Sequence, residues 1–184
     1  MPAKRGQMYS SSGNLATIAG GLPYAIAAQV AFPERQCVAV VGEGGFSMLM
    51  AEFATAVKYR LPIKVVVIKN NSLGQIQWEQ MVFLGNPEYG CELQPIDFAM
   101  FARACGGYGV TISDPSSCGA LLDEALATPG PVLIEAVVDP SEPPMPPNVT
   151  MKQAGHLLES ILKGEPNRKK IAVTIAEDKV REMV

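Results

Sequence analysis

The chain has few charges and no long apolar run, and these shortages exclude several classes of protein. No uninterrupted apolar stretch reaches the 18 residues that a membrane-spanning helix needs. The net charge is −3, so the chain lacks the basic surface that a nucleic-acid-binding protein requires. Residues 1–13 carry basic side chains but no apolar segment of the kind found in secretion signals, so we expect a cytoplasmic protein.

Metal-binding and redox signatures are also missing. The chain has four cysteines, none of them in a CxxC pair, so neither a zinc site nor a thioredoxin-like centre is expected. We interpret the four as buried or incidental free thiols. The single histidine, His156, lies in a polar segment near the end of the chain, where we expect it at the surface or in packing.

What the chain does have is an alternation of β-rich apolar runs and helical patterns. The expected strands are 37–42, 64–69, 108–112 and 131–139. The stretches before and between them have helical patterns, with Pro23 suited to a first turn and Asp97 suited to a cap. This order predicts an α/β fold: a doubly wound, mostly parallel sheet with helices on both faces.

The composition changes after the last expected strand. We predict an α/β domain over 1–140, with an irregular lead-in at 1–13, then a proline-rich linker at 141–148 and a helical tail at 149–184. The tail is amphipathic near its end, so contact with a membrane is one interpretation and packing on a partner is the simpler one. Apolar residues make up 48% of the chain, which fits a domain with large contact surfaces.

Two loops of similar form follow the first two expected strands. Gly42–Gly45 (GEGG) and Asn70–Gly74 (NNSLG) each lead from a strand into a helix. In a parallel sheet both loops lie at the carboxyl edge, where ligands bind, and each helix start favours an anion. A carboxylate, an amide and a backbone carbonyl are oxygen ligands that suit Mg²⁺. The residues therefore suggest a metal–diphosphate site, although each loop alone could be an ordinary turn.

The two loops resemble the acid-and-asparagine motif of thiamine-diphosphate-dependent enzymes, with Glu43 and Asn70 27 residues apart (70 − 43). Four further stretches resemble this family, in its pyruvate oxidase and acetolactate synthase branch: LATIAGGLP, GFSMLMAEFATAVKYRLPIKVVVIKNNSLGQIQWEQ, DFAMFARACGG and GPVLIEAVVD. The PSEPPMPP and GEPNRKK stretches resemble pyruvate oxidase or quinone-linked pyruvate dehydrogenase more narrowly.

The resemblance implies a role for individual residues. Glu43, Asn70 and the carbonyl of Ser72 would hold Mg²⁺. Residues that would bind thiamine diphosphate are Thr17, Ile18, Gly42, Gly44, Gly45, Asn70, Leu73, Gly74, Gln75 and Ile76. Ile18 would be the apolar wedge that bends the cofactor, with core packing as the alternative. Glu79 would be the catalytic side chain, with a solvated helix face as the alternative.

The chain departs from the family in two respects. The family's acid is aspartate, and the extra methylene of Glu43 moves the carboxylate by about 1.3 Å. The resemblance covers only the C-terminal, diphosphate-binding domain; the pyrimidine-binding domain, with its activating glutamate, and the FAD-binding domain of a full-length parent have no counterpart here. We therefore expect a fragment or a split subunit that is inactive alone.

The function implied is decarboxylation of a 2-keto acid such as pyruvate, with thiamine diphosphate and Mg²⁺, in a homodimer or homotetramer. Two alternatives stay open: a degenerate, non-catalytic assembly module, favoured by Glu43, and an acetolactate synthase-like carboligase domain. A Rossmann-type nucleotide-binding domain is a poor alternative, because Ser47 stands where the GxGxxG fingerprint needs its last Gly or Ala.

Overall fold

The computed structural model describes residues 6–11, 13, 15–142 and 150–182, which form two compact units. Unit 1 consists of residues 1–69 and 96–137, and unit 2 of residues 70–95 and 138–184. The predicted proline-rich linker falls largely on 143–148, outside the described residues. The predicted domain limits stay a prediction.

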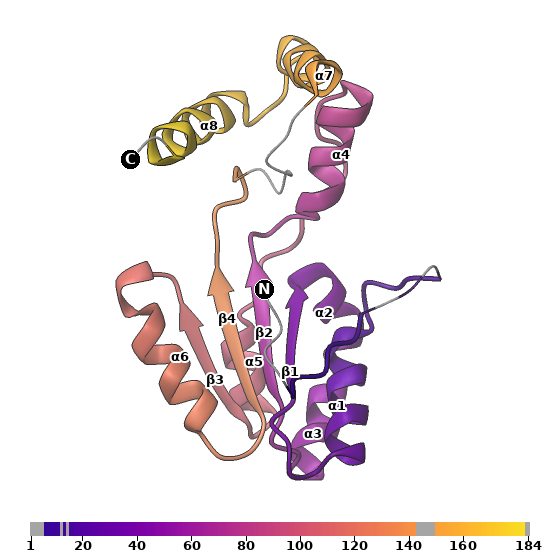
Figure 1. The fold of residues 1–184 in the computed structure, drawn as a ribbon, viewed down its shortest axis with the longest axis vertical. Helices are drawn as coiled ribbons and strands as arrows, with labels where there is room; N and C mark the ends of the chain where they lie inside the picture. Colours follow the sequence, from indigo (N-terminus) through magenta and orange to yellow (C-terminus); the bar gives the residue numbers. More distant parts are fainter. Residues whose placement is uncertain (1–5, 12, 14, 143–149, 183–184) are drawn as a thin grey trace. The chain divides into compact units, whose positions relative to one another are not determined.

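Unit 1 is built on a parallel sheet of four strands in the order β1-β2-β4-β3 (Figure 1). The strands are β1 (Val38–Gly42), β2 (Lys64–Lys69), β3 (Tyr108–Ile112) and β4 (Val132–Val137). Val40 is the partner of Val66 in β2, and Val66 is the partner of Ile134 in β4. All four predicted strands are confirmed; β2 and β4 are largely buried, whereas the edge strand β1 leaves Val38 and Val40 exposed.

Helices cover both faces of this sheet, as predicted. Helices α1 (Gly21–Ala31), α3 (Glu52–Lys58) and α5 (Phe98–Ala104) pack on one face, against Val65, Val67 and Leu133. The short helix η1 (Pro115–Ser117) leads into α6 (Cys118–Ala127), which packs on the other face, against Val132 and Ile134. Alternate residues of a strand thus serve the two cores.

The helical pattern predicted after β1 is divided in the structure. Helix α2 (Glu43–Leu49) starts directly after Gly42, so the expected glycine-rich turn is largely the first turn of this helix. Between α2 and α3, Phe53 N–H bonds the Met50 carbonyl (2.9 Å) and Ala54 N–H the Ala51 carbonyl (3.1 Å). These bonds span three residues instead of four, so the chain tightens locally where the sequence predicts one continuous helix.

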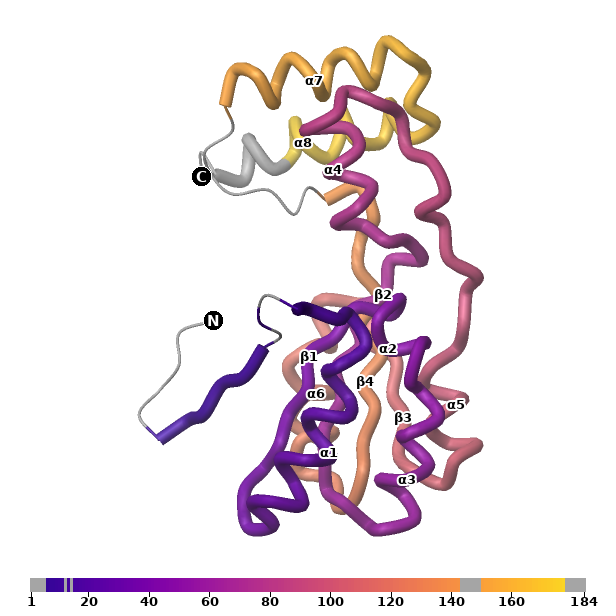
Figure 2. The backbone as a smooth tube through the Cα atoms, turned by 90° about the vertical axis from the view of Figure 1, so that its right-hand side faces the viewer, coloured from indigo at the N-terminus to yellow at the C-terminus, as the bar shows by residue number. Residues whose placement is uncertain are grey.

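Unit 2 is helical and contains α4 (Gly74–Leu84), α7 (Met151–Leu162) and α8 (Arg168–Glu182), with α4 and α7 packed together (Figure 2). Its small core centres on Trp78, Met81, Val82 and Ile171. His156 supports this packing, with Nδ1 3.2 Å from the Val82 carbonyl. Among the described residues, no helix combines the length and apolarity needed to cross a membrane.

Candidate functional site

The loop after β1 buries its carboxylate. Gly42 is extended (ψ 151°), and the chain turns directly into α2, with Glu43 as its first residue. Glu43 is only 4% exposed although it lies at the carboxyl edge of the sheet. A glutamate is rarely this buried without a charge partner or a metal ion. The position therefore fits the predicted ligand better than a solvated surface residue.

The segment before α1 lies directly on this loop. A Cβ atom added to Gly45 would lie 2.1 Å from the Ile18 carbonyl oxygen, so only glycine allows the two backbones to approach this closely. Thr17 shapes the segment by accepting a hydrogen bond from Ala19 N–H (3.3 Å). The fold of unit 1 thus joins two stretches that the sequence connects only through the family resemblance.

The side chain of Ile18 is 59% exposed, so core packing does not account for it. Its backbone is fixed against Gly45 while its apolar side chain is left accessible. This arrangement is what an apolar support for a ligand needs. The wedge role itself stays a prediction.

Hydrogen bonds hold the loop after β2, which belongs to unit 2. Asn70 Oδ1 accepts from Ser72 N–H (2.9 Å), and Asn71 takes a left-handed conformation (φ 58°). Leu73 N–H bonds the Cys91 carbonyl (2.8 Å), and Leu93 N–H bonds the Asn71 carbonyl (2.9 Å). The loop is therefore ordered by its own turn and by an antiparallel contact with residues 91–93.

The first residue of helix α4, Gly74, lies next to the Asn70 side chain. A Cβ atom on Gly74 would lie 2.9 Å from Asn70 Nδ2, so the glycine keeps space for that amide. The next predicted residues, Gln75 and Glu79, are exposed and are joined by a hydrogen bond between Gln75 Nε2 and Glu79 Oε1 (3.1 Å). A catalytic Glu79 and a solvated helix face are both compatible with this exposure.

The predicted residues are divided between the units. Glu43 belongs to unit 1, while Asn70 and Ser72 belong to unit 2. No group of three or more His, Cys, Asp and Glu side chains suited to a metal ion occurs among the described residues. The predicted ligand set is of another type, with one carboxylate, one amide and one backbone carbonyl.

The donor chemistry and the glycine contacts fit thiamine diphosphate with Mg²⁺. The three donors are hard oxygen atoms, and Mg²⁺ takes the rest of its shell from water and phosphate oxygens. Asn70 Oδ1 accepts a hydrogen bond from Ser72 N–H, and an amide oxygen is a suitable Mg²⁺ ligand. Gly42 has nothing within 4 Å of an added Cβ, so the backbone there is accessible to a ligand. The length of Glu43 is the one departure from this fit.

The thiol of the β2 loop region is an unsuitable nucleophile. Burial raises the pKa of Cys91, and the nearby carboxylates of Glu88 and Glu165 raise it further, against a backbone hydrogen bond at Tyr89 that lowers it. A protonated thiol is neither a nucleophile nor a metal ligand. All four cysteines are free thiols, as the sequence predicts.

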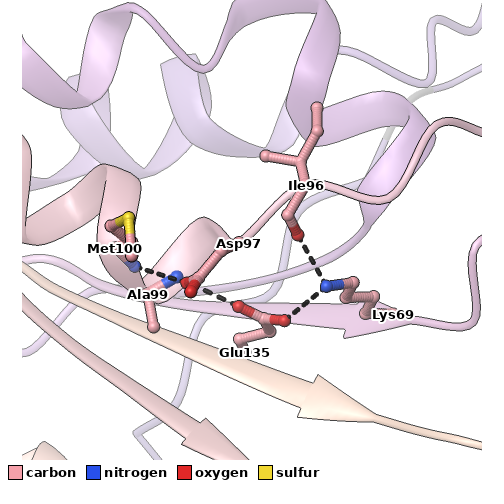
Figure 3. A network of polar contacts seen from close by, with 6 residues as sticks. All are labelled: Lys69, Ile96, Asp97, Ala99, Met100 and Glu135. Carbon is pink, nitrogen blue, oxygen red and sulfur yellow. Dashed lines mark hydrogen bonds and ion pairs between the residues drawn. The ribbon is translucent and has the colours of Figure 1, made fainter.

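A buried ion pair lies where the β2 loop begins, and sequence reasoning missed it. Lys69 Nζ lies 2.6 Å from Glu135 Oε1 and donates to the Ile96 carbonyl at 2.6 Å (Figure 3). Glu135 Oε2 accepts from Ala99 N–H (3.0 Å). The signal in the sequence was a charge at the end of one apolar strand run, KVVVIK, and a charge inside another, PVLIEAVV.

Comparison with known proteins identifies the family of the chain. Residues 1–136 match the family described as thiamine pyrophosphate enzyme, C-terminal TPP binding domain. The chain is 44% identical over 149 residues to the Bacillus subtilis protein named "Putative thiamine pyrophosphate-containing protein YdaP", covering 81% of this chain and 26% of that one. It is 33% identical over 159 residues to the mitochondrial acetolactate synthase catalytic subunit of Saccharomyces cerevisiae, covering 86% and 22%.

A solved structure supports the same assignment. The thiamine diphosphate-dependent 4-hydroxybenzoylformate decarboxylase of Rhodococcus jostii aligns with a TM-score of 0.60 and 26% identity, over 65% of this chain and 23% of that one. The chain spans about a quarter of the length of the curated relatives it matches. The family match rules out the alternative of a Rossmann-type nucleotide-binding domain. The chain belongs to the family of C-terminal, thiamine pyrophosphate-binding domains of thiamine pyrophosphate enzymes.

Proposed function

We propose that this chain is the diphosphate- and Mg²⁺-binding domain of a 2-keto acid decarboxylating enzyme of the pyruvate oxidase type. The contact of Ile18 with Gly45, beside the buried Glu43, carries the proposal. It places an exposed apolar side chain, a close-approach glycine and a buried carboxylate within one unit. The resemblance of the PSEPPMPP and GEPNRKK stretches to pyruvate oxidase supports the oxidase type over the carboligase type.

In this proposal the chain's own residues bind and orient. Glu43, Asn70 and the Ser72 carbonyl hold the metal ion, and the backbone at Gly44–Gly45 and Leu73–Gly74 borders the diphosphate. The Ile18 side chain supports the rings, and Glu79 faces the substrate. When bound, thiamine diphosphate supplies the electron sink for loss of CO₂ from the 2-keto acid. The activating glutamate comes from a pyrimidine-binding domain of the same enzyme, so this chain alone does not turn over.

Calorimetric titration of thiamine diphosphate with Mg²⁺ tests the binding role, with the Glu43→Asp variant as comparison. We expect both proteins to bind, and the aspartate variant to bind about tenfold more tightly, because Mg²⁺ demands near-ideal ligand geometry. Binding by the variant alone would favour the degenerate-module alternative. Absence of binding by both would contradict a site formed by this domain alone.

The reaction type is tested on the full-length enzyme that contains this domain. With pyruvate, an oxidase-type enzyme releases CO₂ and reduces an added electron acceptor. An acetolactate synthase-type enzyme instead condenses two pyruvate molecules and leaves the acceptor oxidised. Formation of acetolactate at a rate equal to CO₂ release would contradict the oxidase proposal.

A further inference from the structure

Lys69 and Ile96 mark the two points where the chain leaves and re-enters unit 1. Unit 1 ends its first part at Lys69 and resumes at Ile96, and the 26 intervening residues (95 − 70 + 1) belong to unit 2. The Lys69 ammonium donates to the Ile96 carbonyl at 2.6 Å. One hydrogen bond therefore closes the base of the segment that carries Asn70 and every predicted site residue of the second loop and α4.

Glu135 completes this closure from the neighbouring strand. Its two carboxylate oxygens bond Lys69 Nζ (2.6 Å) and Ala99 N–H (3.0 Å), so β2, β4 and the start of α5 are tied together (Figure 3). Asp97 caps the same helix by accepting from Met100 N–H (2.6 Å). After the 70–95 segment, the chain thus re-enters unit 1 at the start of α5, where the carboxylates of Glu135 and Asp97 accept backbone hydrogen bonds.

The pair is buried, which makes its geometry demanding. The side chains of Lys69 and Glu135 are 13% and 4% exposed. Burying two charges is costly unless their hydrogen bonds are well made, so such a pair favours one arrangement of the groups around it. The Lys69 ammonium also lies 5.8 Å from the centre of the Phe98 ring, which adds a third contact from the returning chain.

We infer that Lys69 and Glu135 are positioning residues for the cofactor site: together with the Ile96 carbonyl they clamp the base of the 70–95 segment and so fix where the Asn70–Gly74 loop starts. The cofactor-binding role of the loop rests on the proposed function. The contacts of the clamp do not depend on it. Neither side chain is assigned a contact with the cofactor or the substrate.

The opposite end of the same strand supplies a matched control. Lys64 Nζ likewise makes two hydrogen bonds, both to carbonyls, those of Thr128 (2.5 Å) and Gly130 (2.9 Å), and Lys64 is buried. It pairs with no carboxylate in any ion pair of the described residues, and no predicted site residue adjoins it. Lys64→Met therefore removes comparable contacts at the edge of the sheet away from the loops.

Hydrogen exchange of the ligand-free chain tests the clamp. Lys69→Met combined with Glu135→Gln removes both charges without leaving one buried and unpaired, and the glutamine oxygen can still accept from Ala99 N–H. We expect the Ser72 and Leu73 amides to exchange about tenfold faster or more, the factor for losing one hydrogen bond from a charged donor. The same amides in Lys64→Met should keep their rates relative to the amides of β2.

Equal acceleration in both variants, or none in either, would overturn the inference, because the loop would then follow global stability or its own contacts. If the double variant does not fold, Glu135→Gln alone is measured against the same control. Titration of thiamine diphosphate with Mg²⁺ is the second readout: affinity should fall about tenfold or more in the clamp variant and stay unchanged in Lys64→Met. If the parent chain does not bind, a cofactor site formed by this domain alone is contradicted, while hydrogen exchange still decides the clamp.

Discussion

The loops after β1 and β2 have the same layout in the sequence but are held by different forces. The first, Gly42–Gly45, is fixed by packing: its carboxylate is buried and its last glycine, Gly45, lies against the Ile18 backbone. The second, Asn70–Gly74, is fixed by hydrogen bonds within its own turn and to residues 91–93. A similar strand–loop–helix layout therefore does not imply a similar physical basis.

This difference predicts different sensitivities. A packed backbone contact has no space for an added atom, because relieving the overlap requires a backbone shift. A loop held by hydrogen bonds accepts extra volume at a flexible side chain but loses stability when an acceptor is removed. Substitutions matched between the two loops can separate these cases.

The largest effect is expected for Gly45→Ala. The new methyl group would overlap the Ile18 carbonyl oxygen, and we expect the free energy of unfolding to fall by roughly 3 kcal/mol. Urea unfolding measures this change. Gly42→Ala is the control: an added Cβ meets nothing within 4 Å and the backbone conformation suits alanine, so a change below about 1 kcal/mol is expected. Equal costs at both positions would remove the packing explanation.

A smaller effect is expected for Asn70→Ala. The substitution deletes the oxygen that accepts from Ser72 N–H, and we expect a loss of about 1 kcal/mol in the free energy of unfolding. Asn70→Asp keeps an acceptor at the same place and should cost less. If Asn70→Asp were as costly as Asn70→Ala, the Ser72 hydrogen bond would not be what orders this loop.

The polar contacts of unit 2 should also weaken in acid. The Ser141 N–H, and then the Lys170 ammonium, lower the pKa of Asp139 below its ordinary value of 3.8, with burial acting in the opposite direction. This carboxylate therefore contributes stability above pH 3.8, and the contribution is lost as the pH falls through its lowered pKa. Asp139→Asn should cost less than about 1 kcal/mol at pH 7, because the pair is partly exposed, and this cost should shrink as the pH falls below 3.8.

Urea unfolding of the Asp139→Asn variant and its parent at several pH values measures this difference. Hydrogen exchange assigns the difference to a unit, since amides of the sheet in unit 1 should not respond. A difference in stability that did not shrink as the pH fell below 3.8 would show that the Asp139 charge is not its source.

The smallest effect is expected for Gly74→Ala, the same substitution as Gly45→Ala but in the second loop. The added Cβ would meet the end of the Asn70 side chain, which can rotate away, and alanine favours the helix that starts here. We expect the free energy of unfolding to change by less than about 1 kcal/mol, while cofactor affinity falls because the Asn70 amide is displaced. A cost as large as that of Gly45→Ala would abolish the distinction between the two loops.

Much of the fold could be predicted because its signals are local. The four strands are β-branched runs, and Asp97 caps α5 as its position before an apolar run predicts. The division of α2 from α3 was missed, because the pattern of apolar residues is equally compatible with a continuous helix. For the predicted site, the sequence named Ile18 and Gly45 through resemblance, but no local pattern contains the contact between them.

The sequence by itself determined the strand and helix pattern and, through its two loops, the family. Only the tertiary structure decided that the Ile18 backbone lies on Gly45, that Glu43 is buried and that Lys69 is joined to both Glu135 and Ile96. The physical reason is sequence separation: Lys69 and Glu135 lie 66 residues apart and meet only because β2 and β4 are neighbours in the sheet. Periodicity and capping act within a few residues, whereas such contacts exist only once the strands have paired.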